Sequence, residues 1–264
     1  MIGGNVMEWE HQMGNHKGFL HHPETDDDDR QFYIQQKEIA YQLLEIGRHF
    51  VEHDGVLHHR SIPCSREELA VGAKYLHRGA YCPSPVLDLL ITNTKRGKIL
   101  RRPSPRSKIS NRFIFDASGK LLYTDNYLFD GKLGSSEYLL YEGDTVYGVT
   151  LAQFGGIVSV SRERYAQGRI VSYDCAYYAP GLAGIECFQM FCERYHYDDI
   201  GLLTWEYYQL HFSFETVATS GFVKHERFRF TREDGRLTSF IPVTPEGKPM
   251  KDYEPTVVRS PRKA

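Results

Sequence analysis

The histidines between residues 49 and 59 are the side chains in this chain that most resemble a metal site. His49 and His53 stand four residues apart, which places two imidazoles on one face of a helix, with Asp54 beside them and His58 and His59 following. No glutamate lies between the pair in the position that a catalytic HExxH site requires. We therefore interpret the segment as an exposed helix end and predict no metal site.

Asp116, Asp198 and Asp199 are the carboxylates that could do acid–base chemistry. Each precedes a glycine that is typical of a tight turn, where an aspartate side chain accepts hydrogen bonds from the turn backbone. We interpret all three as turn residues. The chain has no GxxxxGK[ST], GxGxxG, GxSxG or protein-kinase motif, and no local context makes Cys64 or Cys82 a nucleophile. We predict no catalytic residues and no cofactor, so an enzyme is the weaker hypothesis.

Eight basic residues gather in one short segment, and they could contact phosphate, the acidic run 26–29 or an acidic partner. They are Lys95, Arg96, Lys98, Arg101, Arg102, Arg106, Lys108 and Arg112. No nucleic-acid-binding module or stacking platform accompanies them. The net charge of −2, from 32 basic and 34 acidic residues, gives no general attraction to nucleic acid or anionic membranes. We favour a solvated linker, keep an acidic partner as the alternative, and expect no nucleic-acid partner.

Arginines and aromatic residues are interleaved in the second half of the chain. These are the residue types that dominate binding energy at protein interfaces, so they could form a partner-binding face. The candidates are Arg162, Arg164, Tyr165, Arg194, Tyr195, Tyr197, Trp205, Arg227 and Arg229. Cross-strand charge and aromatic pairs explain the same residues equally well. Both interpretations stay open at this point.

These residues belong to a phrase that the chain repeats from Asn111 onward. Each copy has an aromatic–polar–aromatic stretch, a turn closing on glycine and a β-rich run, as in RFIFDASGKLLY, SRERYAQGRIVSY, ERYHYDDIGLLTWEY and ERFRFTREDGRLTSF, with a looser copy in EYLLYEGDTVYGV. A fixed-period repeat indicates a stack of similar supersecondary units. Between Arg112 and Phe240 lie 26 of the 35 aromatic residues, a density that favours strands. We predict a meander of about ten antiparallel strands.

The phrases FDASGKL, YDDIGLL and TREDGRLTSF resemble YD repeats, the tyrosine–aspartate units of Rhs-type and teneurin proteins. The aromatic–aspartate positions and the turn glycine of that motif are matched by Phe115-Asp116, Tyr197-Asp198, Gly119, Gly201 and Gly235. The resemblance covers about half of the chain. It implies a structural sheet of coiled hairpins without catalytic residues, and an association with bacterial toxins and their antagonists.

Three helices are expected before the repeats. Apolar residues at 4, 3, 4 spacing from Ile39 to Phe50 predict an amphipathic helix that starts near Arg30 and stops at Gly55. The capping box over residues 65–68 predicts a second helix ending at residue 79, and Ser84-Pro85 predicts a short third one. We expect a polar His-rich and acidic tail over 1–29, a helical region with a basic linker over 30–110, the hairpin sheet over 111–242 and a C-terminal tail over 243–264.

The expected fold class is therefore α+β, with N-terminal helices packed on a large open, twisted antiparallel meander sheet. The five cysteines form no CxxC pair, so we expect reduced and mostly buried thiols. Cys187 and Cys192 lie five apart in one expected strand and should point to opposite faces.

A wide aromatic sheet without catalytic motifs predicts a protein-binding module. Together with the toxin association that the YD-repeat resemblance implies, its most specific version is an immunity-type antagonist that docks on a bacterial toxin domain and blocks its active site. The alternatives are an enzyme or small hydrophobic-ligand carrier with a pocket between helices and sheet, and a structural fragment of a repeat system. No apolar run approaches the ~20 residues of a membrane span, and the N-terminus lacks the apolar core of a signal peptide. We expect a cytoplasmic protein with no membrane partner.

Overall fold

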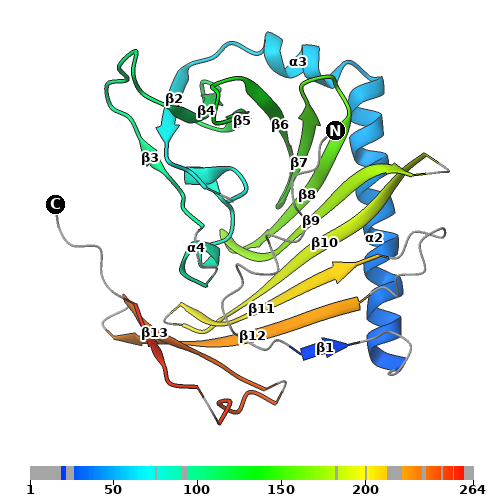
Figure 1. Cartoon of the computed structure of the whole chain (residues 1–264), viewed down its shortest axis with the longest axis vertical. Coiled ribbons are helices and arrows are strands. Elements are labelled where there is room, and N and C mark those ends of the chain that lie inside the picture. The colour runs from blue at the N-terminus through cyan, green and yellow to red at the C-terminus, as the bar shows by residue number, and fades with distance from the viewer. Residues whose placement is uncertain are drawn as a thin grey trace.

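One antiparallel sheet forms most of the molecule (Figure 1). The computed structural model describes residues 19–21, 27–74, 76–90, 94–181, 184–199, 201–212, 222–233, 236–244, 246–251 and 253–258. The strands of the repeat region pair in sequence order, as a meander requires. They are β4 (Ile109–Phe115), β5 (Leu121–Tyr127), β6 (Leu133–Glu142), β7 (Thr145–Ala152), β8 (Ile157–Ala166), β9 (Arg169–Gly181), β10 (Gly184–Tyr197), β11 (Leu202–His211), β12 (Phe222–Glu233) and β13 (Arg236–Pro242). The predicted α+β meander is confirmed.

The described sheet is larger than the predicted ten strands. Beyond β4 it continues through β2 (Arg66–Val71) and β3 (Lys98–Ile99), and beyond β13 through β14 (Thr256–Val257). A further strand, β1 (Phe19–His21), pairs with the first half of β12, where β13 does not reach. The sheet curls strongly along its length, so that β2 and β4 arch away from the plane of β12 (Figure 1). Its two faces are therefore a convex and a concave one.

The long helix α2 (Asp27–Glu52) crosses the convex face, which we call the helix face (Figure 1). Leu43 of the helix is 1% exposed, and Val160 of β8 and Met190 of β10 are fully buried in the same apolar cluster. The predicted amphipathic helix is thus confirmed, starting three residues earlier than expected. A second helix, α3 (Gly55–Ser61), follows at once. Gly55 has no room for a side chain, because a Cβ there would lie 2.6 Å from the carbonyl oxygen of Phe50.

The second predicted helix is wrong, because residues 66–71 form strand β2. Its backbone pairs with β4 from Arg66 opposite Phe115 to Val71 opposite Ile109, which completes the sheet beyond the first repeat strand. The capping-box pattern is local, and pairing with a strand about forty residues away overrides such local preference. The third predicted helix is present as α4 (Leu87–Leu90), with the Ser84 hydroxyl accepting the Leu87 N–H at 3.2 Å.

The concave face is covered by the connection between β2 and β3, which we call the strap (described residues 72–74, 76–90 and 94–97). The strap contains a 3₁₀ turn, η1 (Gly79–Tyr81), and α4, and it lies inside the curve of the sheet (Figure 1). Val86 of the strap is buried in one apolar cluster with Trp205 and Phe228 of the sheet. We call this side the strap face. The sheet therefore buries both of its faces, one under helices and the other under an irregular segment.

All five cysteines are free, and four of them are buried. Cys187 and Cys192 both belong to the helix-face cluster, so the expectation of opposite faces is wrong. The cause is a β-bulge between Cys187 and Gln189, which inserts one residue into β10 and reverses the alternation beyond it.

Candidate protein-docking groove

The nine residues predicted to form one partner-binding face lie on both faces of the sheet. The aromatic members are buried on the strap face or packed against its cluster: Tyr165, Tyr195, Tyr197 and Trp205. The arginines occupy the alternating positions that point to the helix face: Arg162, Arg164, Arg194, Arg227 and Arg229. Arg164 and Arg229 are exposed, whereas Arg162 is 8% and Trp205 1% exposed. A role of these residues in binding a partner stays a prediction.

Three of those arginines form a ladder of alternating charge across five neighbouring strands. Asp174 of β9 contacts Arg162 of β8 at 2.8 Å and Arg194 of β10 at 2.7 Å. Arg194 stands opposite Glu206 of β11, and Glu206 contacts Arg227 of β12 at 2.8 Å. Opposite charges placed directly across a sheet stabilise the pairing of strands. Of the two interpretations left open by the sequence, cross-strand pairing accounts for these three arginines.

A buried ion-pair cluster anchors the strap to the concave face. Arg78 of the strap, 4% exposed, donates to Glu137 at 2.9 Å and also pairs with Glu163, and it donates to the Ser161 hydroxyl at 3.1 Å. Gly148 of β7 makes room for this guanidinium, because a Cβ there would lie 2.6 Å from Nη2 of Arg78. The arrangement places one cation between two carboxylates inside the protein.

The pKa of Glu137 reflects its contacts with the other side chains of the cluster. Burial by itself raises the pKa of a carboxyl group, but the charge of Arg78 and the contact with His77 lower the pKa of Glu137 to about 2. His77 Nε2 lies 3.0 Å from the second carboxylate oxygen. The carboxylate is therefore ionised at neutral pH, and we assign it a structural role in holding the strap.

A second buried carboxylate, Glu193, fixes the other end of the strap. One of its oxygens accepts hydrogen bonds of 2.6 Å from Ser84 of the strap, from Tyr195 and from the indole of Trp205. Burial raises the pKa of Glu193, and the three hydrogen bonds oppose that rise. The polar atoms of Tyr195 and Trp205 are thus satisfied inside the molecule.

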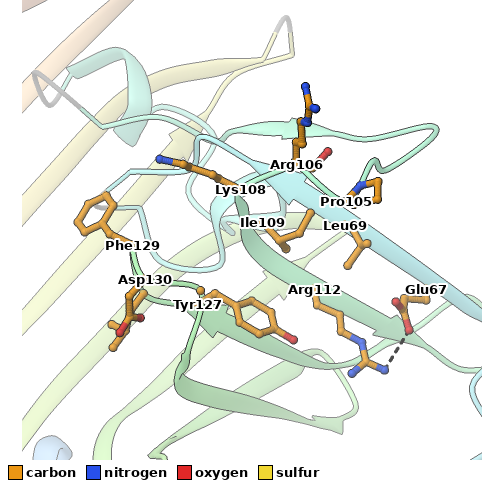
Figure 2. A pocket seen from close by; sticks show the side chains of 13 residues that line it. Glu67, Leu69, Pro105, Arg106, Lys108, Ile109, Arg112, Tyr127, Phe129 and Asp130 are labelled. Carbon is orange, nitrogen blue, oxygen red and sulfur yellow. Dashed lines mark ion pairs between the residues drawn. The ribbon is translucent and has the colours of Figure 1, made fainter.

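An open groove lies where the helix face continues past the helices, at the β2 end of the sheet (Figure 2). Its volume is about 630 Å³, and its floor is made by Leu69 of β2, Ile109 and Arg112 of β4, and Tyr127 of β5. Arg112 and the α3 residue Arg60 both contact Asp125, at 3.7 and 3.3 Å, which places the groove on the face that α3 covers.

The walls of the groove combine basic and apolar side chains. One wall is the loop that joins β3 to β4 and carries Arg106 and Lys108, and the other is the hairpin tip that carries Leu128 and Phe129 (Figure 2). Phe129 is 98% exposed and Leu128 56%. An aromatic and an aliphatic side chain held in water beside arginines are typical of a binding surface.

The positive charge of the loop wall is not neutralised within the described part of the chain. Arg101, Arg102, Arg106 and Lys108 form no ion pair with any described carboxylate, whereas both acidic residues of the groove are paired. Glu67 contacts Arg112 at 2.9 Å (Figure 2). The hairpin-tip aspartate, Asp130, contacts Lys132 at 3.1 Å. The groove therefore presents a net positive wall.

The basic wall of this groove was singled out from the sequence, but its apolar wall was not. The basic segment was recognised, although a solvated linker was the favoured interpretation for it. Phe129 was missed, and the signal available for it is a large apolar pair, Leu128 and Phe129, directly before the Asp130-Gly131 turn. Apolar side chains at a turn tip have no core to enter, so they point into solvent unless a partner covers them.

Two other pockets lie at loops and at the sheet edge. One of about 770 Å³ lies beside β13 and β14, and one of about 420 Å³ lies beside the strap at residues 94–98. Neither they nor the groove lies between α2 and the sheet. Within the described ranges no group of three or more His, Cys, Asp or Glu side chains could hold a metal ion, and the rings of His49 and His53 lie 3.9 Å apart between centroids. Of the described helices, none combines the length and the apolar character needed to span a membrane.

Comparison with known proteins adds remote structural similarity alone. No family model and no curated protein matches the sequence. Among solved structures, a chain of the crystal structure of TcdB2-TccC3-Cdc42 is similar, with 13% sequence identity and a TM-score of 0.17. The match covers 61% of this chain and 10% of the other, so this chain corresponds to a small part of that protein's length. A similarity at this level assigns neither a fold family nor a function.

Proposed function

We propose that this chain is a protein-binding module whose groove binds an acidic segment of a partner protein. The observation that carries the proposal is that Phe129, 98% exposed, lines the same groove as Arg106 and Lys108, two cations that form no ion pair in the described structure. An acidic segment with one large apolar residue satisfies both walls. Its carboxylates pair with Arg106 and Lys108, and its apolar side chain packs between Phe129 and the floor residue Ile109.

The two walls contribute different properties to such a complex. Burying the ring of Phe129 contributes about 2 kcal/mol, the scale for a large apolar side chain removed from water. The exposed cations contribute mainly to the rate of association and to selection of an acidic partner, and their effect weakens as salt increases. We therefore expect affinity to depend on Phe129 at any ionic strength, and association rate to depend on the loop cations at low salt.

The more specific proposal is that the partner is a bacterial toxin domain, which this chain antagonises as an immunity protein. It is supported by the resemblance of the hairpin phrases to YD repeats, and by the use of a preformed groove rather than a catalytic cluster. The alternatives of an enzyme, a hydrophobic-ligand carrier and a repeat fragment stay predictions.

The groove proposal is tested with variants of both walls and matched controls. Phe129→Ser and Lys108→Glu are compared with Phe154→Ser and Lys248→Glu, which alter an equally exposed hairpin-tip phenylalanine and an exposed lysine far from the groove. Binding of fluorescent acidic peptides with one central Trp or Leu is measured by anisotropy. We expect both groove variants to lose binding and both controls to keep it.

Equal binding by groove and control variants would overturn the groove as the site. Preferential binding of single-stranded oligonucleotide by the wild-type chain would overturn the class of partner, since an exposed phenylalanine beside cations can also stack a base. For the antagonist proposal, the chain is co-expressed with a toxin encoded next to it. Protection of growth that Phe129→Ser abolishes supports the proposal, and unprotected growth with no complex between the purified proteins overturns it.

A further inference from the structure

We propose that Ser104, which lies in the same loop as the groove residues Arg106 and Lys108 but does not line the groove, is a phosphorylation site that switches off binding of acidic partners. The regulatory part of this proposal rests on the proposed function, whereas the modification itself does not. Ser104 lies in the sequence Arg101-Arg102-Pro-Ser-Pro-Arg106, with two arginines before it and a proline directly after it. Protein kinases select serines largely by the charge pattern around them, and an exposed loop gives a kinase access to the chain.

The loop geometry distinguishes Ser104 from the neighbouring Ser107. The Ser107 hydroxyl accepts the Ser104 N–H at 3.0 Å, and the Ser107 N–H donates to the Ser104 carbonyl at 2.9 Å, so Ser107 closes the turn and is half-buried. Ser104 is exposed, and the only contact of its hydroxyl in the described structure is the Ser107 hydroxyl at 3.2 Å. Ser104 is thus the hydroxyl that can leave the turn without breaking a backbone bond.

The reaction requires a nucleoside triphosphate and a protein kinase. The Ser104 oxygen forms a bond to the γ-phosphorus, the bond from that phosphorus to the bridging oxygen breaks, and the nucleoside diphosphate leaves. The proton of the hydroxyl passes to a base of the kinase. The product carries a charge of about −1.5 to −2 at neutral pH and pairs readily with arginines. The phosphate on Ser104 lies within four residues of the four loop cations, Arg101, Arg102, Arg106 and Lys108. Its charge of about −2 cancels about half of the positive charge that attracts an acidic segment.

The modification is tested on the whole chain with ATP and two kinases, one proline-directed and one arginine-directed, followed by peptide mass spectrometry. We expect a single phosphate at Ser104, lost in Ser104→Ala and retained in Ser107→Ala. A phosphate on Ser107 instead, or none with either kinase, would overturn the proposal. A ³¹P titration gives a readout that needs no partner. We expect the second pKa of the phosphate to fall below its ordinary value of about 6, because arginines favour the dianion. An ordinary pKa would show that the loop cations do not hold the phosphate.

The regulatory step is tested with the acidic peptides used for the groove. We expect Ser104→Ala to bind like the wild type, and the phosphorylated chain to bind about tenfold more weakly at low salt, with a smaller difference at high salt. Phosphorylation at Ser104 without a change in affinity would overturn the switch. If the unmodified chain binds none of the peptides while Ser104 is still phosphorylated, the groove proposal fails and the modification site stands.

Discussion

Replacing Arg78 by Met tests whether the buried ion-pair cluster holds the strap on the sheet. Methionine keeps an unbranched side chain and removes the charge, so Glu137 and Glu163 are left facing each other across the space made by Gly148. Both carboxylate side chains are at most 3% exposed, so in the wild type their charges lie away from bulk water. The variant therefore isolates the effect of one buried charge.

The expected loss of stability follows from the acidity of Glu137. Lowering its pKa from 4.5 to about 2 corresponds to about 3 kcal/mol of stability at neutral pH, at about 1.4 kcal/mol for each tenfold change in proton affinity. Removing one partner of a buried ion pair costs about 3–5 kcal/mol in other proteins. We expect Arg78→Met to lose roughly this amount, which is a large part of the 5–15 kcal/mol typical of a folded domain.

The pH dependence gives the sharper test. In the wild type, the folded pKa of Glu137 is below its unfolded value, so its contribution is present above pH 4.5 and is lost as pH falls toward about 2. In Arg78→Met the remaining effect of burial raises the Glu137 pKa, and protonation then relieves the unpaired charge. The difference in stability between wild type and variant should be largest between pH 7 and pH 8 and should shrink as pH falls through 5 to 4.

Urea unfolding between pH 4 and pH 8, followed by the fluorescence of the buried Trp205, measures this difference. Arg164→Met is the matched control, since it makes the same chemical change at an exposed position next to Glu163, and we expect it to cost less than about 0.5 kcal/mol. Adding Glu137→Gln to Arg78→Met should restore part of the loss. A deficit below about 1 kcal/mol, or one that grows on acidification, would refute the reasoning.

Three smaller changes test other parts of the packing, each by calorimetric or urea unfolding. Gly148→Ala should cost about 3 kcal/mol, since its methyl group would overlap the Glu137 carboxylate and the Arg78 guanidinium, and a neutral effect would mean that the cluster can move. Asp174→Asn should cost about 2 kcal/mol, because it leaves Arg162 and Arg194 without a charged acceptor. An unchanged stability would mean that water replaces the lost carboxylate. Tyr178→Phe removes a buried hydrogen bond of 2.6 Å to the Ala40 carbonyl that joins the sheet to α2, and about 1 kcal/mol is expected, with an unchanged Tm contradicting the contact.

The strands and turns of the repeat region could be predicted because the information for them is local. Asp116 accepts the N–H groups of Ser118 at 2.8 Å and Lys120 at 2.9 Å, and Gly119 has φ of 84°, which only glycine adopts readily. Asp198 likewise accepts the Gly201 N–H at 2.8 Å. Each turn thus depends on residues within five positions of one another. The turn glycine at position 235 lies outside the described residues, as does most of the tail predicted over 1–29.

What the sequence could not reveal depends on contacts between distant segments. Strand β2 pairs with β4 through backbone groups, and backbone pairing does not depend on side-chain type. A six-residue segment is also too short to show a clear hydrophobic period, so the capping-box pattern at its start predicted a helix wrongly. The bulge in β10 changes which face Cys187 occupies, and a bulge has no reliable local signal when no glycine marks it. The strap is irregular, and its anchor Arg78 has φ of 57°, a conformation that its side-chain type does not suggest.

The two faces of the sheet also explain where binding specificity can reside. The repeated phrase supplies aromatic residues to the strap face and arginines to the helix face. Most of these aromatic residues pack in the core, and most of these arginines form ion pairs in the charge ladder. The two walls of the groove come from segments outside the phrase, which are the loop between β3 and β4 and the tip of the hairpin between β5 and β6. Phe154 is 95% exposed at another hairpin tip but lines none of the described pockets. If exposure alone made a binding site, Phe129→Ser and Phe154→Ser would be equivalent. A difference between them measures what the position of Phe129 beside the basic loop adds to its hydrophobicity.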